Sequence, residues 1–246
     1  MVWGAAPPGP EGRPVAGNAR VIDGDTLEID GTRVRLEGID APETGQRCAR
    51  KLEQIATARR RVSREDARTI KRIERASDSE GSESALVGSW ACGAAATTAL
   101  VRLTESKRIE CRPRGTDKYG RLLGVCFADG RDINAAMVRQ GLAWAFVRYS
   151  TAYVSEEKAA RGERLGIWQA DTETAWDYRA KRWTAVEDKA PSGCAIKGNV
   201  TRNGRIYHMP WSPWYGRIQM DLDKGKRWFC TEAEALAAGW RPVEAH

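Results

Sequence analysis

Three acidic side chains near the N-terminus are of the types that could act on a charged substrate. Asp25 follows an Asp-Gly turn in VIDGDTLEI, while Asp40 and Glu43 follow the strand-like stretch VRLEGI. If segments 21–29 and 32–39 pair through the intervening Asp-Gly turn, Asp25 and Asp40 lie near the same end of a sheet. Hard carboxylate oxygens in such a place suit Ca²⁺ or Mg²⁺ and not zinc. Asp-Gly turns and surface aspartates are common, so DGDT alone is weak evidence for a site.

Arg35 adds a group that recognises phosphate. Apolar and polar residues alternate along the second segment, which places Val34 and Leu36 on one face and Arg33, Arg35 and Glu37 on the other. The planar guanidinium fork of arginine matches the geometry of a phosphate group. Arg35 beside the carboxylates therefore indicates either a phosphate-directed site or a solvated turn.

The composition narrows the class of protein. The chain has 246 residues, of which 41% are hydrophobic and 30% are charged, with a net charge of +7. Residues 1–49 carry 5 basic and 8 acidic side chains, and the remainder is basic. A basic molecule with an acidic pocket suggests a polyanionic partner met through a cation, although a well-solvated surface explains the charge equally well. No apolar run approaches the ~20 residues that a membrane-spanning helix needs.

The shortage of histidine argues against some other hydrolytic chemistries. The sequence holds only His208 and His246, both near its C-terminal end. This argues against a nuclease with a histidine base and against a Ser-His-Asp hydrolase.

Along the chain, the composition changes several times. Residues 1–18 are rich in proline and glycine, and we expect a disordered tail. Residues 19–170 alternate short strands with three helices, which is typical of a small barrel with helical supports. Within them, residues 49–80 predict a charged helical insertion that is either a solvated excursion or a basic arm that grips nucleic acid. Residues 171–190 predict an amphipathic linker helix, and residues 191–246 a small module of short strands with one short helix.

The six cysteines include no CxxC pair, so a closely spaced zinc knuckle is not expected. Cys111 and Cys126 lie in two predicted strands joined by a turn-rich loop, where a bridge is natural. Cys48 with Cys92 and Cys194 with Cys230 are our choices among 15 possible sets of three pairings. Three bridges imply an oxidising compartment, so we expect a periplasmic or secreted protein, although no signal peptide is visible at the start of the sequence.

The C-terminal module admits two interpretations. Cys194, His208 and Cys230 are three potential zinc ligands, but a fourth is not evident, and a disulfide with a packed histidine is the simpler interpretation. The tryptophans of the module suit the core of a very small domain better than a surface on which bases stack.

Four stretches occur in a familiar order: VIDGDTLEI, VRLEGIDAPE, DKYGRLLGVCFADGRDINAAMVRQGLA and RLGIW. Together they resemble the thermonuclease family, typified by staphylococcal nuclease, over roughly residues 19–168. The resemblance implies an α+β fold, namely a five-stranded OB-type β-barrel with three helices, and Ca²⁺-dependent hydrolysis of DNA and RNA. The C-terminal module is similar to one found at the ends of bacterial nuclease-like and envelope-associated proteins.

The resemblance also implies a role for each site residue. Arg35, Glu43 and Arg121 would be catalytic: the arginines clamp the phosphate and Glu43 acts as general base or orients the attacking water. Asp25, Asp40 and the backbone carbonyl of Ala41 would bind Ca²⁺; many family members have threonine at this last position. Lys118 and Tyr119 would line the nucleotide groove.

These observations predict a calcium-dependent nuclease, with a non-catalytic OB-type nucleic-acid-binding module as the alternative. A module that had lost its activity should also have lost some of the site residues. We expect a monomer that takes DNA or RNA as its substrate. A third interpretation is that the C-terminal module targets the protein to the envelope or to a protein partner.

Overall fold

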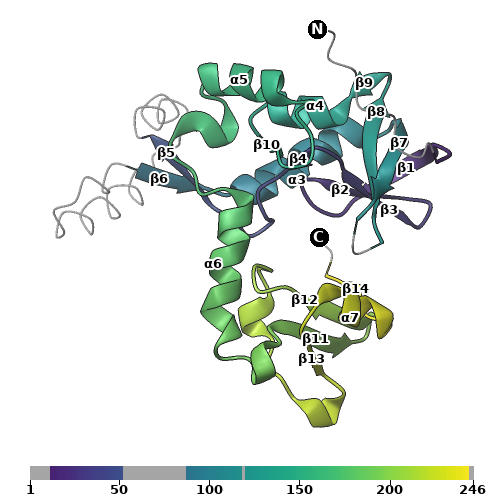
Figure 1. The fold of residues 1–246 in the computed structure, drawn as a ribbon, viewed down its shortest axis with the longest axis vertical. Helices are drawn as coiled ribbons and strands as arrows, with labels where there is room; N and C mark the ends of the chain where they lie inside the picture. The colour runs from purple at the N-terminus through teal and green to yellow at the C-terminus, as the bar shows by residue number, and fades with distance from the viewer. Residues whose placement is uncertain (1–11, 52–86, 118–119, 244–246) are drawn as a thin grey trace, which may run out of the picture.

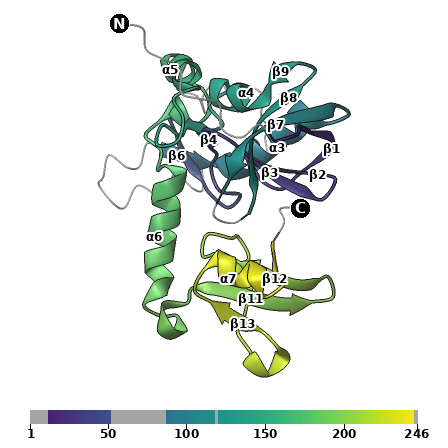
Figure 2. The ribbon, with the colours of Figure 1, turned by 45° about the vertical axis from the view of Figure 1, so that its right-hand side comes forward.

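The computed structural model describes residues 12–51, 87–117 and 120–243. They form an N-terminal barrel with helices around it, a long connecting helix, and a smaller C-terminal sheet (Figure 1). The C-terminal sheet lies beside the end of the barrel that carries the β2–β3 strands, as two views agree (Figure 2).

The barrel has five strands: β1 (Val15–Val21), β2 (Thr26–Ile29), β3 (Thr32–Leu36), β7 (Arg108–Thr116) and β8 (Leu122–Ala128). They are ordered β3-β2-β1-β7-β8, and a parallel pairing of β3 with β8 closes the sheet on itself. The two-residue strand β9 (Arg131–Asp132) adds to β8. The predicted five-stranded OB-type barrel is therefore confirmed.

The hairpin between β2 and β3 turns at the predicted Asp-Gly pair. Asp30 and Gly31 both have positive φ, at 48° and 77°, which is the backbone that a two-residue hairpin turn requires. This turn fixes the register so that Thr26 faces Arg35 across the strands. Val34 and Leu36 point into the core, as the alternation predicts, and Arg35 lies on the other face.

In the described part of the chain, three helices support the barrel, as expected: α3 (Cys92–Thr104), α4 (Ile133–Arg139) and α5 (Val154–Gly162). The first two bury Leu100, Met137 and Val138 in the same core as the barrel strands. Short strands β4 (Ile39–Asp40) and β10 (Trp144–Ala145) pair beside them and hold the chain that leaves β3.

Two sequence predictions need correction. Residues 15–18 are not part of a disordered tail, because they form the start of β1. Their backbone groups pair with residues 108–111 of β7, a distant segment that composition does not reveal. Residues 49–51 are not helical: β5 (Cys48–Lys51) pairs with β6 (Val87–Trp90). The rest of the expected 49–80 insertion, from residue 52 on, lies outside the described residues.

The linker helix and the C-terminal module follow. Helix α6 (Ala175–Glu187) leads to β11 (Ile196–Thr201), β12 (Gly204–His208), β13 (Arg227–Phe229), α7 (Glu232–Ala237) and β14 (Arg241–Pro242). The four strands form one sheet over a separate small core that includes Tyr207, Phe229 and Trp240. Single turns of 3₁₀ helix complete the described chain: η2 (Gly166–Gln169), η3 (Pro191–Gly193), η4 (Tyr215–Arg217) and η5 (Leu222–Lys224).

All six cysteines are bridged, as Cys48–Cys92, Cys111–Cys126 and Cys194–Cys230. The three pairings are those predicted, and the third removes both thiolates from any zinc site with His208. Three disulfides point to an oxidising environment, periplasmic or extracellular. Among the described residues, no helix combines the length and apolarity needed to cross a bilayer.

Candidate active site

Asp25 occupies the turn between β1 and β2 and is almost fully buried. Its Oδ1 accepts hydrogen bonds from Arg35 and from the Thr26 hydroxyl, at 2.5 and 3.2 Å, and its Oδ2 accepts one from the backbone N–H of Ala41 at 2.9 Å. Burial raises the pKa of Asp25, and the nearby charge of Arg35 opposes that shift. A carboxylate held in this way needs positive charge beside it to stay ionised.

Arg35, on β3, joins the two predicted metal ligands. One guanidinium nitrogen donates to Asp25 at 2.5 Å and another donates to Asp40 at 2.8 Å. Burial alone would lower the pKa of Arg35, but Asp25 and Asp40 together raise it, so the guanidinium stays charged. The hairpin register brings Arg35 and Asp25 together, and the β4–β10 pairing brings Asp40 to them.

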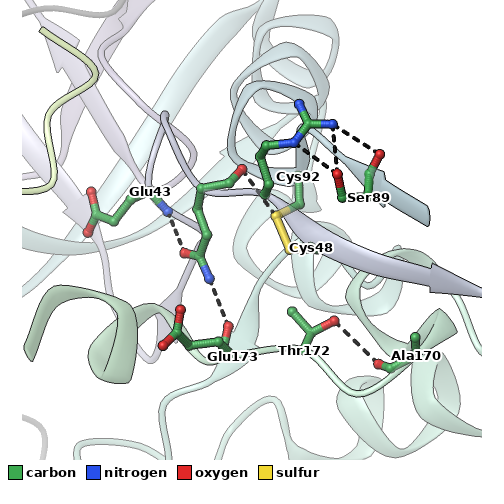
Figure 3. Close-up of a disulfide and its surroundings, with 9 residues drawn as sticks. Glu43, Cys48, Ser89, Cys92, Ala170, Thr172 and Glu173 are labelled. Carbon is green, nitrogen blue, oxygen red and sulfur yellow. Dashed lines mark hydrogen bonds between the residues drawn. A yellow bond between two sulfur atoms is a disulfide. The ribbon is translucent and has the colours of Figure 1, made fainter. Parts of the chain in front are cut away.

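Glu43 lies in a tight turn three residues after Asp40. The backbone N–H of Gln46 donates to the Glu43 carbonyl at 2.7 Å, and the Gln46 side-chain carbonyl accepts from the Glu43 N–H at 3.1 Å. The amide of Gln46 also donates to the backbone carbonyl of Glu173, at 2.7 Å. Figure 3 shows this connection between Glu43 and Glu173 next to the Cys48–Cys92 disulfide. The turn is thus fixed to the segment that precedes α6.

Arg179, on α6, completes the cluster and was missed in the sequence. Its guanidinium donates to both carboxylate oxygens of Asp40, at 3.1 and 2.6 Å, and to Glu43 at 2.7 Å. The available signal was its position: residues 176, 179 and 183 lie on one face of the predicted linker helix. Trp176 and Trp183 share that face, so packing explains the pattern equally well, and nothing in the sequence alone assigns Arg179 to the site.

The electrostatics of Glu43 distinguish it from an ordinary surface carboxylate. Burial raises the pKa of Glu43 to about 7, and the neighbouring Arg179 opposes that shift. Within the cluster, Arg35 pairs with Asp25 and Asp40, and Arg179 pairs with Asp40 and Glu43. A group with a pKa near neutrality can both accept and release a proton at physiological pH.

This cluster lies beside a cleft of about 790 Å³, which Asp40, fully buried, does not line. Arg35, Glu43, Arg121 and Arg179 all line it. The Arg121 guanidinium pairs with Asp117 at 2.7 Å. Both predicted phosphate-binding arginines therefore face the same cleft. Lys118 and Tyr119 lie outside the described residues.

The C-terminal module forms the opposite wall of this cleft. Tyr207, Trp211 and Trp214 line the cleft from the module. The module approaches the barrel closely, since a side chain at Gly45 would come within 3.2 Å of Pro213. The tryptophans of the module therefore divide between two places: Trp240 belongs to its core, as predicted, whereas Trp211 and Trp214 border the cleft.

The donor atoms present fit a hard divalent cation. Asp25 and Asp40 supply carboxylate oxygens and Ala41 a backbone carbonyl, which are the ligand types that Ca²⁺ and Mg²⁺ take. In the part of the chain that the structure describes, no three His, Cys, Asp or Glu side chains gather as a ready-made metal cluster. A cation here would thus depend on two carboxylates, a carbonyl and water.

A closed OB-type barrel with arginines and carboxylates beside one cleft is the class of protein that the fold and the site define. The comparison with known families specifies that class further. The family model "Staphylococcal nuclease homologue" matches residues 33–170, and the chain belongs to this family. A second family model, ArfC, matches residues 177–242, which include Arg179 and the module.

Several curated proteins are similar to this chain. The succinoglycan biosynthesis protein ExoI of Rhizobium meliloti is 33% identical over 175 residues, which span 69% of this chain and 72% of that protein. The micrococcal nuclease of Shigella flexneri is 29% identical over 65% of this chain and 77% of its own length. An uncharacterized endonuclease of Escherichia coli O157:H7 is 28% identical over 66% of this chain and 83% of its length. The family membership supports a nuclease function with a nucleic-acid substrate.

Proposed function

We propose that this protein is a calcium-dependent nuclease that hydrolyses phosphodiester bonds of DNA or RNA. The observation that carries the proposal is the convergence of Asp25, Arg35, Asp40 and Glu43 in one hydrogen-bonded cluster beside a cleft that Arg121 also lines. The relatives named as nucleases support the same reaction.

Arg35 and Arg121 stabilise the charge that develops on the phosphate. When water attacks phosphorus, a five-coordinate arrangement forms with extra negative charge on its equatorial oxygens. Guanidinium groups that bind this arrangement more tightly than the starting diester lower the barrier. Bound to Asp25, Asp40 and the Ala41 carbonyl, Ca²⁺ would supply further positive charge to the same phosphate. Lys118 and Tyr119 complete the proposed substrate contacts.

Glu43 accepts the proton of the attacking water. A new bond forms between the water oxygen and phosphorus, the bond from phosphorus to the leaving sugar oxygen breaks, and that oxygen takes up a proton from solvent. The pKa of Glu43, about 7, suits a group that removes a proton at neutral pH. The carboxylate faces Arg179 in this structure, so it must part from that arginine to reach the water.

The alternative is an OB-type barrel that binds nucleic acid without cutting it. The full set of predicted site residues favours the enzyme, because none of Asp25, Arg35, Asp40, Glu43 and Arg121 has been replaced. Passive binding would need the arginines but not a buried carboxylate cluster.

A cleavage assay distinguishes the two functions. The full chain is incubated with labelled single-stranded and duplex DNA and RNA in CaCl₂ or in EGTA. We expect cleavage that requires Ca²⁺, and Glu43→Gln should lower the rate at least about a hundredfold while the protein stays folded. Glu37→Gln is the matched control, since Glu37 lines the same cleft and the charges that act on it are those of Arg114 and Asp132. Binding without cleavage by the wild-type protein would favour the passive module.

A further inference from the structure

The hydrogen bonds of Asp40 leave little room for a cation. Asp40 Oδ1 accepts from Arg35 at 2.8 Å and from Arg179 at 3.1 Å, and Oδ2 accepts from Arg179 at 2.6 Å. The Asp40 side chain is 0% exposed, so water does not compete for these oxygens. Each oxygen of this carboxylate is already neutralised by a guanidinium N–H.

A divalent cation and Arg179 cannot share Asp40 in this arrangement. A Ca²⁺ ion lies about 2.3–2.6 Å from each ligand oxygen. Such an ion on Asp40 would come next to the Arg179 guanidinium, and like charges at that separation repel strongly. Arg35 also donates to Asp25 and Asp40 and lines the cleft, but it lies on a strand of the barrel, whereas Arg179 lies on the linker helix.

The net charge of the cluster leads to the same conclusion. With all groups ionised, the carboxylates of Asp25, Asp40 and Glu43 face the guanidiniums of Arg35 and Arg179, which leaves a net charge of −1. Without Arg179 the net charge is −2, and the attraction for a divalent cation is greater. Arg179 therefore opposes cation binding both by position and by charge.

Packing contacts anchor the helix on the N-terminal side of Arg179, so a displacement of the guanidinium would be a movement of the side chain and not of the helix. Ala175 and Tyr178 are buried, and Trp176 stacks on Phe146 with ring centroids 5.5 Å apart. The Arg179 side chain is 23% exposed and borders the cleft.

We propose that Arg179 is a tethered cation that competes with the divalent metal for Asp40, and that the metal binds only after the arginine has swung away. The inference rests on the proposed function for its metal. If Arg179 competes with the metal, the linker helix helps to determine metal affinity, although this helix lies outside residues 33–170, which match the nuclease family.

Calorimetric titration of CaCl₂ into the full-length protein tests this proposal without any substrate. Apparent affinity equals intrinsic affinity multiplied by the fraction of molecules that are competent to bind. If Arg179 occupies Asp40 in about nine of ten molecules, Arg179→Gln should bind Ca²⁺ about tenfold more tightly. Lys181→Gln is the matched control, because it removes the same charge from the same helix at a side chain that is 77% exposed and pairs only loosely with Glu173, at 3.6 Å. Its affinity should change less than twofold.

Thermal unfolding provides the second measurement. Arg179→Gln should unfold at lower temperature than wild type in EGTA, because Asp40 loses a partner, and CaCl₂ should raise its midpoint more than that of wild type. If this variant fails to fold, Arg179→Lys keeps the charge and should bind Ca²⁺ with intermediate affinity.

Unchanged or weaker Ca²⁺ binding by Arg179→Gln, with wild-type binding intact, overturns the competition and leaves the proposed nuclease standing. Failure of both proteins to bind Ca²⁺ overturns the competition together with the metal of the proposed function. In that case, DNA cleavage that persists in EGTA would show that the nuclease activity does not need Ca²⁺.

Discussion

Arg35→Lys separates two contributions of Arg35 to stability and to the reaction rate, namely the geometry of its guanidinium fork and its positive charge. Arg35 donates separate N–H groups to Asp25 at 2.5 Å and Asp40 at 2.8 Å, and these bonds come from different nitrogens of one rigid plane. A lysine ammonium is a compact charge on a flexible stem and does not reproduce the fork. The substitution therefore keeps the net charge of the cluster and removes one of the two carboxylate contacts.

The lost contact sets the expected magnitudes. A hydrogen bond to a charged group contributes about 1.5–3 kcal/mol, so the free energy of unfolding of the barrel should fall by roughly that amount. For a unit of about 150–250 residues this corresponds to a melting temperature lower by roughly 3–12 °C. Removing one donor from a developing oxyanion typically costs about 10²–10³ in rate, and kcat/KM should fall in that range.

The assay is cleavage of a labelled single-stranded DNA in CaCl₂, at a temperature where each variant is folded by circular dichroism. Arg33→Lys is the control, since Arg33 lies two residues earlier on the same strand and face, lines the same cleft, and has its guanidinium 3.8 Å from Glu28. The control should stay within about threefold of wild type. If Arg35→Lys also stays within threefold while its melting temperature falls as expected, the fork serves the fold and not the reaction, and the reasoning is refuted.

Three other changes test different parts of the molecule. Replacing both Cys48 and Cys92 by alanine opens a loop of 44 residues and should lower the free energy of unfolding by about 4 kcal/mol, measured by thermal denaturation. Burial lowers the pKa of His208 to about 4, so the unfolded chain gains a proton below pH 6.5 that the folded one does not, and stability falls as the pH drops from 6.5 towards 4. In His208→Gln, the free energy of unfolding should therefore depend less steeply on pH, by up to about 1.4 kcal/mol per pH unit, which melting temperatures between pH 6.5 and 4 would reveal. The same pH dependence in the variant and the wild type would contradict this. Because β5 and β6 are directly paired, replacing residues 52–86 by Asn-Gly should preserve Ca²⁺-dependent cleavage, and a folded but inactive deletion would contradict this.

The parts of the site that the sequence predicts are those set by local pairing. Asp25 and Arg35 are only ten residues apart, and an Asp-Gly turn with alternating apolar residues fixes the register that joins them. The disulfide between Cys111 and Cys126 was predictable for the same reason, since both lie in paired strands. A short sequence separation leaves few alternative geometries, so pattern and turn chemistry decide the outcome.

Contacts between distant segments could not be predicted in this way. Arg179 meets Asp40 and Glu43 across 139 and 136 residues, and its helix shows only an amphipathic pattern that explains packing equally well. The start of β1 was assigned to a disordered tail because composition reports on intrinsic preference, whereas pairing with β7 decides the actual conformation. The role of the C-terminal module as a wall of the cleft also depends on the placement of two separate cores.

The connections of Glu43 show why the barrel alone does not define this site. The backbone turn of Glu43 is held through Gln46 to the carbonyl of Glu173, and its carboxylate is held by Arg179. Both partners lie beyond residue 170, where the match to the nuclease family ends. Buried hydrogen-bonded groups cannot exchange their partners for water without a free-energy cost. Because the linker holds both the backbone and the side chain of Glu43, a shift of the linker should also shift Glu43. The linker helix therefore belongs to the site, and the geometry of the three carboxylates is a joint property of the barrel and the segment that leads to the C-terminal module.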